Sequence, residues 1–78
     1  MTRDEFVDVM AMLCDAEDGY YPHMPMSKRM LELWWTTLEP YPAPRFAQAV
    51  TAYAKRNPVH PPNLAEIETS VKPRGVVL

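Results

Sequence analysis

The chain has 78 residues, a length that allows one domain and leaves little room for a deep pocket. It is 47% hydrophobic and 23% charged, and its formal net charge of −2 does not favour nucleic-acid binding, which usually needs a basic face. The single Cys14 excludes an internal disulfide, no apolar run approaches the length of a membrane span, and the first residues do not resemble a signal peptide. We therefore expect a small globular protein in a reducing cytoplasm.

Prolines divide the sequence into segments. There are nine prolines and only two glycines, and most of the prolines fall in three groups, at positions 22–25, 40–44 and 58–62. Because proline interrupts helices, these groups predict the connections between elements. The stretches between them carry apolar residues at helical spacing, and none alternates as a strand does. The sequence predicts an all-α fold, a small bundle of three main helices plus a short C-terminal fourth helix.

The first expected helix begins after Thr2, because Thr2 and Glu5 have the spacing of a capping box. We expect it to end near residues 17–18, with Gly19 as the stop signal. Its apolar stripe consists of Phe6, Val9, Met10 and Leu13.

The second expected helix covers residues 27–38. Its apolar stripe consists of Leu31, Trp34 and Leu38. Trp35 flanks this stripe and is either a residue at the core boundary or a partner contact. Leu33 points to the polar side and is either a lone exposed leucine or a second partner contact.

The third expected helix follows the sequence Tyr-Pro-Ala-Pro, with Pro44 in its first turn. Its buried face consists of Phe46, Ala49, Val50 and Tyr53. The fourth is short. Asn63 is a good N-cap, Glu66 completes a capping box, and Ile67 lies on the apolar side together with Leu64 and Val71. Since so short a helix is marginal alone in water, it must dock on the others.

These segments also carry a resemblance to a known family. The Trp34–Leu38 pair, the turn "EPYPAP", the helix with Phe46 and Ala49, and above all "PPNLAEI" resemble the bacteriophage helicase loader/inhibitor family. The turn at Tyr21 and Pro22 is similar too, and the resemblance covers residues 2–71. Pro62, Ala65, Glu66 and Ile67 match best, followed by Trp34. The residues to which we assign a structural role are Trp34, Leu38, Pro62, Asn63, Glu66 and Ile67.

The resemblance implies a function as well. Members of the family are non-enzymatic accessory proteins of phage DNA replication that bind the replicative hexameric helicase, as loader, inhibitor or both, in the cytoplasm of the bacterial host. They typically continue into a flexible C-terminal tail implicated in gripping the helicase. Here we expect one domain at residues 1–71 and a short flexible tail at 72–78, so that the folded surface or these few residues make the contact.

The sequence contains no recognisable catalytic or cofactor site. His23, His60 and Cys14 have no metal-site spacing, there is no glycine-rich phosphate loop, and neither Ser27 nor Ser70 has a neighbouring histidine. We expect no enzymatic activity, no cofactor, no bound metal and no membrane insertion.

Charge is unevenly distributed along the chain. The first 18 residues hold six acids and one base, and the remainder holds seven bases and four acids. This asymmetry either steers a charged partner or marks an ordinary solvated face. The candidate partner-binding residues are Leu33, Trp35, Lys55, Arg56, Lys72 and Arg74.

Two other functions remain open. Short helices joined by tight turns can form a helix-turn-helix regulator, although no helix here has a basic face and direct duplex DNA binding is therefore not expected. The chain can also be an interaction module for another host protein. Its six methionines either fill gaps in the core, which we prefer, or form an adaptable recognition surface.

Overall fold

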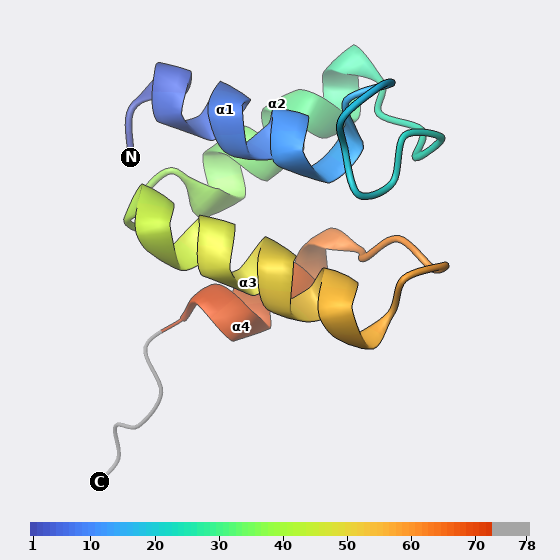
Figure 1. The fold of residues 1–78 in the computed structure, drawn as a ribbon. Helices are drawn as coiled ribbons and strands as arrows, with labels where there is room; N and C mark the ends of the chain where they lie inside the picture. Colours follow the sequence, from blue (N-terminus) through green and yellow to red (C-terminus); the bar gives the residue numbers. More distant parts are fainter. Residues whose placement is uncertain (73–78) are drawn as a thin grey trace, which may run out of the picture.

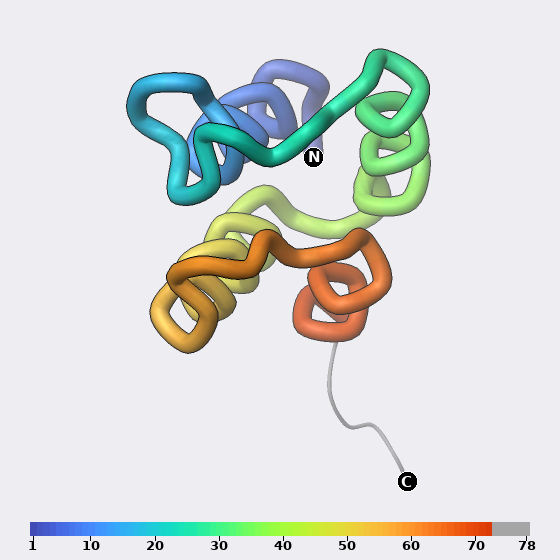
Figure 2. Tube along the Cα trace, turned by 90° about the vertical axis from the view of Figure 1, so that its right-hand side faces the viewer, coloured from blue at the N-terminus to red at the C-terminus, as the bar shows by residue number. Residues whose placement is uncertain are grey.

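The computed structural model describes residues 1–72, which form four helices and no strand. The helices are α1 (Arg3–Cys14), α2 (Lys28–Leu38), α3 (Ala43–Arg56) and α4 (Leu64–Val71). Figure 1 shows α1 above α3 and α4 below α3. Turned by a quarter, Figure 2 shows two pairs, α1 beside α2 above and α3 beside α4 below. The predicted all-α bundle with a short fourth helix is confirmed.

The core lies between the two pairs, and every helix contributes to it. Among the described residues no polar or charged side chain is buried. The largest fully buried side chains of the core are Trp34, Phe6, Phe46, Leu13, Leu38, Ile67, Val50 and Val71. The ring of Phe6 on α1 stacks on that of Phe46 on α3, with 6.0 Å between the centroids. The apolar stripes expected from the sequence therefore meet in one core.

The first helix ends earlier than the sequence predicted. It stops at Cys14, and residues 16–20 form turns and bends in place of the expected last helical turn. The carboxylate of Asp15 accepts hydrogen bonds from the amides of Glu17 and Asp18, each at 3.0 Å. Such side-chain bonds compete with helix continuation, and here they end the helix. Gly19 is needed for a different reason, because a Cβ there would lie 2.4 Å from the Asp15 nitrogen.

The short helix α4 is held at both ends. At its start the Asn63 side chain accepts from the Glu66 amide at 2.8 Å, and Glu66 Oε1 accepts from the Asn63 amide at 3.2 Å. At its end Arg45 Nη1 on α3 donates to the Val71 carbonyl at 3.2 Å. Between the ends Ile67 and Val71 are fully buried. The segment "PPNLAEI" therefore closes the fold, as its sequence predicted.

None of the helices within residues 1–72 has both the length and the apolar character needed to cross a bilayer.

Candidate protein-docking surface

The exposed large hydrophobic residues are concentrated in one region. There are five in the described chain, with relative exposures of 52% for Val7, 46% for Tyr20, 41% for Met30, 58% for Leu33 and 77% for Val59. All of them except Val7 line two adjoining hollows. Single exposed apolar residues are common, whereas a contiguous group is typical of an interaction site.

The two hollows form a continuous surface that we call the apolar band. The first, of about 270 Å³, is lined by Met24, Pro25, Met30, Leu33, Trp34, Pro61, Pro62, Asn63 and Leu64. The second, of about 280 Å³, is lined by Tyr20, Tyr21, Pro22, His23, Met24, Pro25, Pro58, Val59 and Pro61. Three residues are common to both, and neither lining contains Asp, Glu, Lys or Arg. An uncharged, largely apolar lining is what the buried centre of a protein–protein interface requires.

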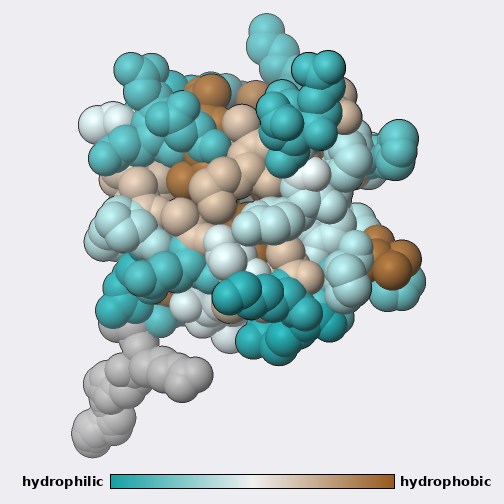
Figure 3. Space-filling view, viewed as in Figure 1, coloured by the Kyte–Doolittle hydropathy of each residue, from teal (hydrophilic) through white to brown (hydrophobic). Residues whose placement is uncertain are grey.

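The band lies where two loops meet α2. The loop between α1 and α2 and the loop between α3 and α4 both cross the front of Figure 2, one above the other. In the space-filling view a hydrophobic protrusion stands at the right-hand edge, where Figure 1 shows the α3–α4 loop (Figure 3). Met30 and Leu33 on the outer face of α2 add the remaining exposed side chains.

Two tyrosines hold these loops together. Tyr21 in the first loop is buried, and its hydroxyl donates to the Asn57 carbonyl at the end of α3 over 2.5 Å. Its ring meets the Tyr53 ring edge to face, with the centroids 6.2 Å apart. The hydroxyl of Tyr53 in turn donates to the Pro61 carbonyl at 3.4 Å. Burial raises the pKa of the Tyr21 hydroxyl, and the neighbouring Tyr53 adds to the shift.

The first loop is also fixed to the end of α1. The amide of Tyr20 donates to the Met12 carbonyl and that of Tyr21 to the Leu13 carbonyl, both at 2.8 Å. These bonds satisfy carbonyls that the end of a helix otherwise leaves free. The walls of the band are thus anchored through backbone and side-chain bonds, and the surface is formed in the chain alone.

The predicted partner-binding residues that lie within residues 1–72 do not gather on one surface. Leu33 lies in the apolar band. Lys55 and Arg56 are exposed in the last turn of α3, and Lys72 at the end of α4 pairs with Glu68 at 3.9 Å. Arg74 lies outside the described residues.

Trp35 faces α1. Its ring meets the Phe6 ring edge to face at 5.3 Å, and the Arg3 guanidinium lies 5.0 Å from its centroid. Arg3 also forms an ion pair with Glu32 on α2. The hydrogen bond from Arg3 lowers the pKa of the Glu32 carboxyl. Trp35 is half-buried in this contact and belongs to the packing between α1 and α2.

The cysteine and the two histidines, which are the residues most suited to bind a transition metal, do not form a common site within residues 1–72. Cys14 is half-buried, its Sγ donates to the Met10 carbonyl at 3.3 Å, and burial raises the pKa of the thiol. His23 and His60 are both exposed. Within residues 1–72 no group of three or more His, Cys, Asp or Glu side chains is placed to hold a metal ion.

Comparison with known proteins identifies the family. The family model for the N-terminal domain of a phage helicase inhibitor/loader matches residues 1–68. The chain belongs to this family. No curated protein and no solved structure matches the chain significantly. Membership of the phage helicase inhibitor/loader family agrees with the resemblance found in the sequence and makes this chain a phage helicase-associated protein.

In this helicase inhibitor/loader domain, most of the apolar band was not predicted from the sequence. Of its exposed side chains only Leu33 was named as a partner contact, whereas Tyr20, Met30 and Val59 were not. Met24 and Met30 line the band, and Met24 also packs against the core. The available signal was the proline groups at positions 22–25 and 58–62, each next to an exposed apolar or aromatic residue.

Proposed function

We propose that this chain is a non-enzymatic accessory protein of phage DNA replication that binds the replicative hexameric helicase through the apolar band, in the cytoplasm of the host cell. Membership of the phage helicase inhibitor/loader family supports the choice of partner. The observation that carries the choice of surface is the gathering of Tyr20, Met30, Leu33 and Val59 on an uncharged, preformed band. In protein interfaces a few well-packed residues, with Tyr among the most frequent, supply most of the binding free energy.

The chain offers a matched pair of variants to test this surface. Leu33 lies in the band and is 58% exposed, whereas Val7 lies on α1, outside the band, and is 52% exposed. Replacing either by glutamate leaves the core intact, so both variants should melt close to the wild type. We expect Leu33→Glu to weaken helicase binding about tenfold or more, and Val7→Glu to leave it unchanged.

The measurement is capture of the purified hexameric helicase on the immobilised chain, followed by titration for the dissociation constant. Wild-type binding by Leu33→Glu would remove the band from the interface. Absence of helicase binding by the wild-type chain would refute the proposed partner itself.

Loader and inhibitor roles are separated by helicase activity. A loader raises the rate at which the helicase begins to unwind a fork coated with single-strand binding protein, and an inhibitor lowers unwinding or ATP hydrolysis at saturating chain. We propose no direct role for duplex DNA, since the net charge is −2. Tight, salt-sensitive binding to random duplex without helicase capture would favour a DNA-binding regulator instead.

A further inference from the structure

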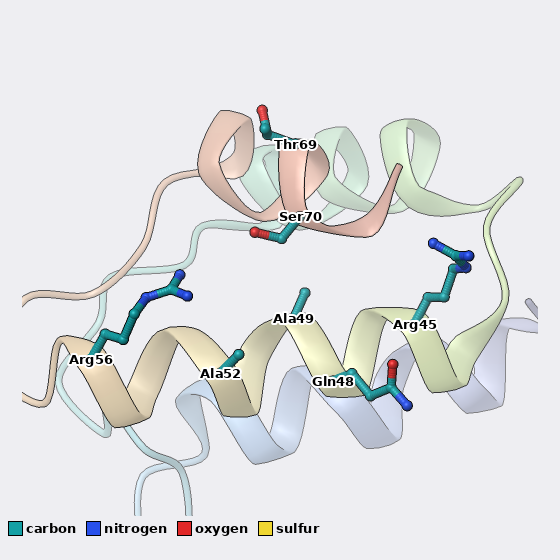
Figure 4. Close-up of a pocket in the computed structure, with 7 residues that line it drawn as sticks. All are labelled: Arg45, Gln48, Ala49, Ala52, Arg56, Thr69 and Ser70. Carbon is teal, nitrogen blue, oxygen red and sulfur yellow. The ribbon is translucent and has the colours of Figure 1, made fainter. Parts of the chain in front are cut away.

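A further hollow, separate from the two of the apolar band, lies between α3 and α4. It has a volume of about 540 Å³, and we call it the basic groove; its lining residues are Arg45, Gln48, Ala49, Ala52, Arg56, Thr69 and Ser70. Figure 4 shows Arg45 and Arg56 at opposite ends, both reaching from α3 towards the α4 side. The small side chains of Ala49 and Ala52 lie along α3 between them, and the Ser70 hydroxyl points into the space from α4.

The spacing of the two arginines determines the size of a ligand that reaches both. They lie on one helix, three turns apart, so both project from the same face with about 16 Å between them along the axis. A single phosphate or carboxylate cannot span this distance. An extended peptide, which rises about 3.3 Å per residue, covers it with roughly five residues.

The charges of the groove lack acidic partners within residues 1–72. The ion pairs of this part of the chain are Arg3 with Glu32 and Lys72 with Glu68. The other acid of α4, Glu66, accepts the hydrogen bond from the Asn63 amide in the cap. Neither arginine of the groove therefore forms an ion pair with a carboxylate of the described fold, although Glu66 and Arg56 both line the neighbouring hollow.

Arg45 is held in position for a second contact. Its Nη1 donates to the Val71 carbonyl at the end of α4. A guanidinium has five N–H donors, so one such bond leaves most of them for a ligand carboxylate. This bond also fixes the side chain beside the groove, which lowers the entropy cost of binding.

The lining favours a peptide over a nucleic acid. Sites for single-stranded nucleic acid combine cations with aromatic platforms on which bases stack. The basic groove is lined by two arginines, two alanines, two hydroxyl residues and a glutamine, with no aromatic residue among them. Guanidinium groups instead match carboxylates in a bidentate geometry.

We propose that the basic groove binds an extended acidic protein segment, with one carboxylate at Arg45 and another at Arg56. The groove and the apolar band have no lining residue in common, so each can be tested by its own variants. The charge of the arginines and the distance between them set the requirement for the ligand. It needs two acidic residues four or six positions apart, because these lie on the same face of an extended segment and are about 13–20 Å apart.

The test uses the whole chain and a synthetic Glu-Ser repeat peptide of about eight residues, long enough to span the arginines. Amide chemical shifts report binding at low ionic strength, where surface charges are least screened. The peptide should shift the amides of Gln48, Ala52 and Ser70, and a Gln-Ser peptide of equal length should not. Arg56→Glu should weaken binding about tenfold, whereas Arg29→Glu, the same charge change at an exposed residue of α2 outside the groove, should weaken it no more than about twofold.

Arg56→Gln provides a second variant should the reversed charge disturb the last turn of α3, and it should still weaken binding several-fold. Equal losses in Arg56→Glu and Arg29→Glu would show diffuse attraction and overturn the site. Tighter binding of a short oligo-dT than of the acidic peptide would assign the groove to nucleic acid instead. Absence of shifts at the groove residues at saturating peptide would exclude the site.

Discussion

Removing one hydroxyl group from Tyr21 tests how the apolar band is assembled. In Tyr21→Phe the ring remains packed against Tyr53, and only the 2.5 Å bond to the Asn57 carbonyl is lost. A hydrogen bond of this kind contributes about 0.5–1.5 kcal/mol to the free energy of unfolding. Because the half-buried Asn57 carbonyl would lose its partner, the total decrease in the variant should approach about 2 kcal/mol. For a domain of this size each kcal/mol lowers the melting temperature by roughly 4–8 °C.

Tyr20→Phe is the matched control. Tyr20 is the adjacent residue, is 46% exposed, and its hydroxyl has no hydrogen-bond partner within residues 1–72. The same chemical change there should alter the free energy of unfolding by less than about 0.5 kcal/mol. Thermal and urea unfolding followed by circular dichroism give both values. Equal stability of the two variants would show that the Tyr21 hydroxyl does not hold the loops together.

The same variant should change the response to alkaline pH. Because burial raises the pKa of Tyr21, its folded-state value lies above the unfolded value of about 10. The folded state therefore favours the protonated hydroxyl, and this contribution is complete below about pH 10 and is lost as pH rises through the folded pKa. Unfolding free energy should fall more steeply above about pH 10 in the wild type than in Tyr21→Phe. Parallel curves would contradict this assignment.

Three further predictions concern the helices. Glu66→Ala should lower the free energy of unfolding by about 1 kcal/mol, because it removes the bond from the Asn63 amide in the cap, and helicase binding per folded molecule should be retained. An unchanged melting temperature together with abolished binding would instead make Glu66 an interface residue. Ile67→Ala should lower the free energy of unfolding further, by about 2–5 kcal/mol, because the side chain is fully buried. A decrease of less than about 1 kcal/mol in urea unfolding would argue against docking of α4 through this residue. The hydrogen bond from Arg3 lowers the pKa of the Glu32 carboxyl, so the folded state favours the ionised form. The wild type should therefore be more stable than Glu32→Gln above about pH 4.5, and this difference should disappear as the pH falls through the folded pKa. A difference that persists at about pH 2 would exclude the ion pair as its cause.

The features that were predictable from the sequence are those set by near neighbours. The cap at Asn63 and Glu66 and the stripe through Trp34 and Leu38 depend on spacings of three or four residues, and the structure contains both. The prediction that α1 ends near residues 17–18 was wrong, because it relied on Gly19 as the stop signal. In the structure the Asp15 side chain accepts hydrogen bonds from the amides of Glu17 and Asp18, and the helix ends before it.

The apolar band depends on contacts between residues far apart in sequence. Tyr21 and Asn57, which bring its two loops together, are 36 positions apart, and no local pattern marks one as the partner of the other. Leu33 was recognisable as an exposed leucine on a polar face, yet its neighbours at Pro61 and Leu64 follow only from the packing of α4. Arg56 was noted for its charge, and its relation to Arg45 and α4 required the fold.

The walls of the apolar band also determine which backbone conformations can dock there. Five of its lining residues are prolines: Pro22, Pro25, Pro58, Pro61 and Pro62. Proline has no amide hydrogen, so much of this rim offers carbonyl acceptors without donors. A partner that binds by adding an edge strand needs a regular alternation of donors and acceptors on the receiving chain. The band is therefore poorly suited to a partner that adds an edge strand, and docking there depends on side-chain contacts instead.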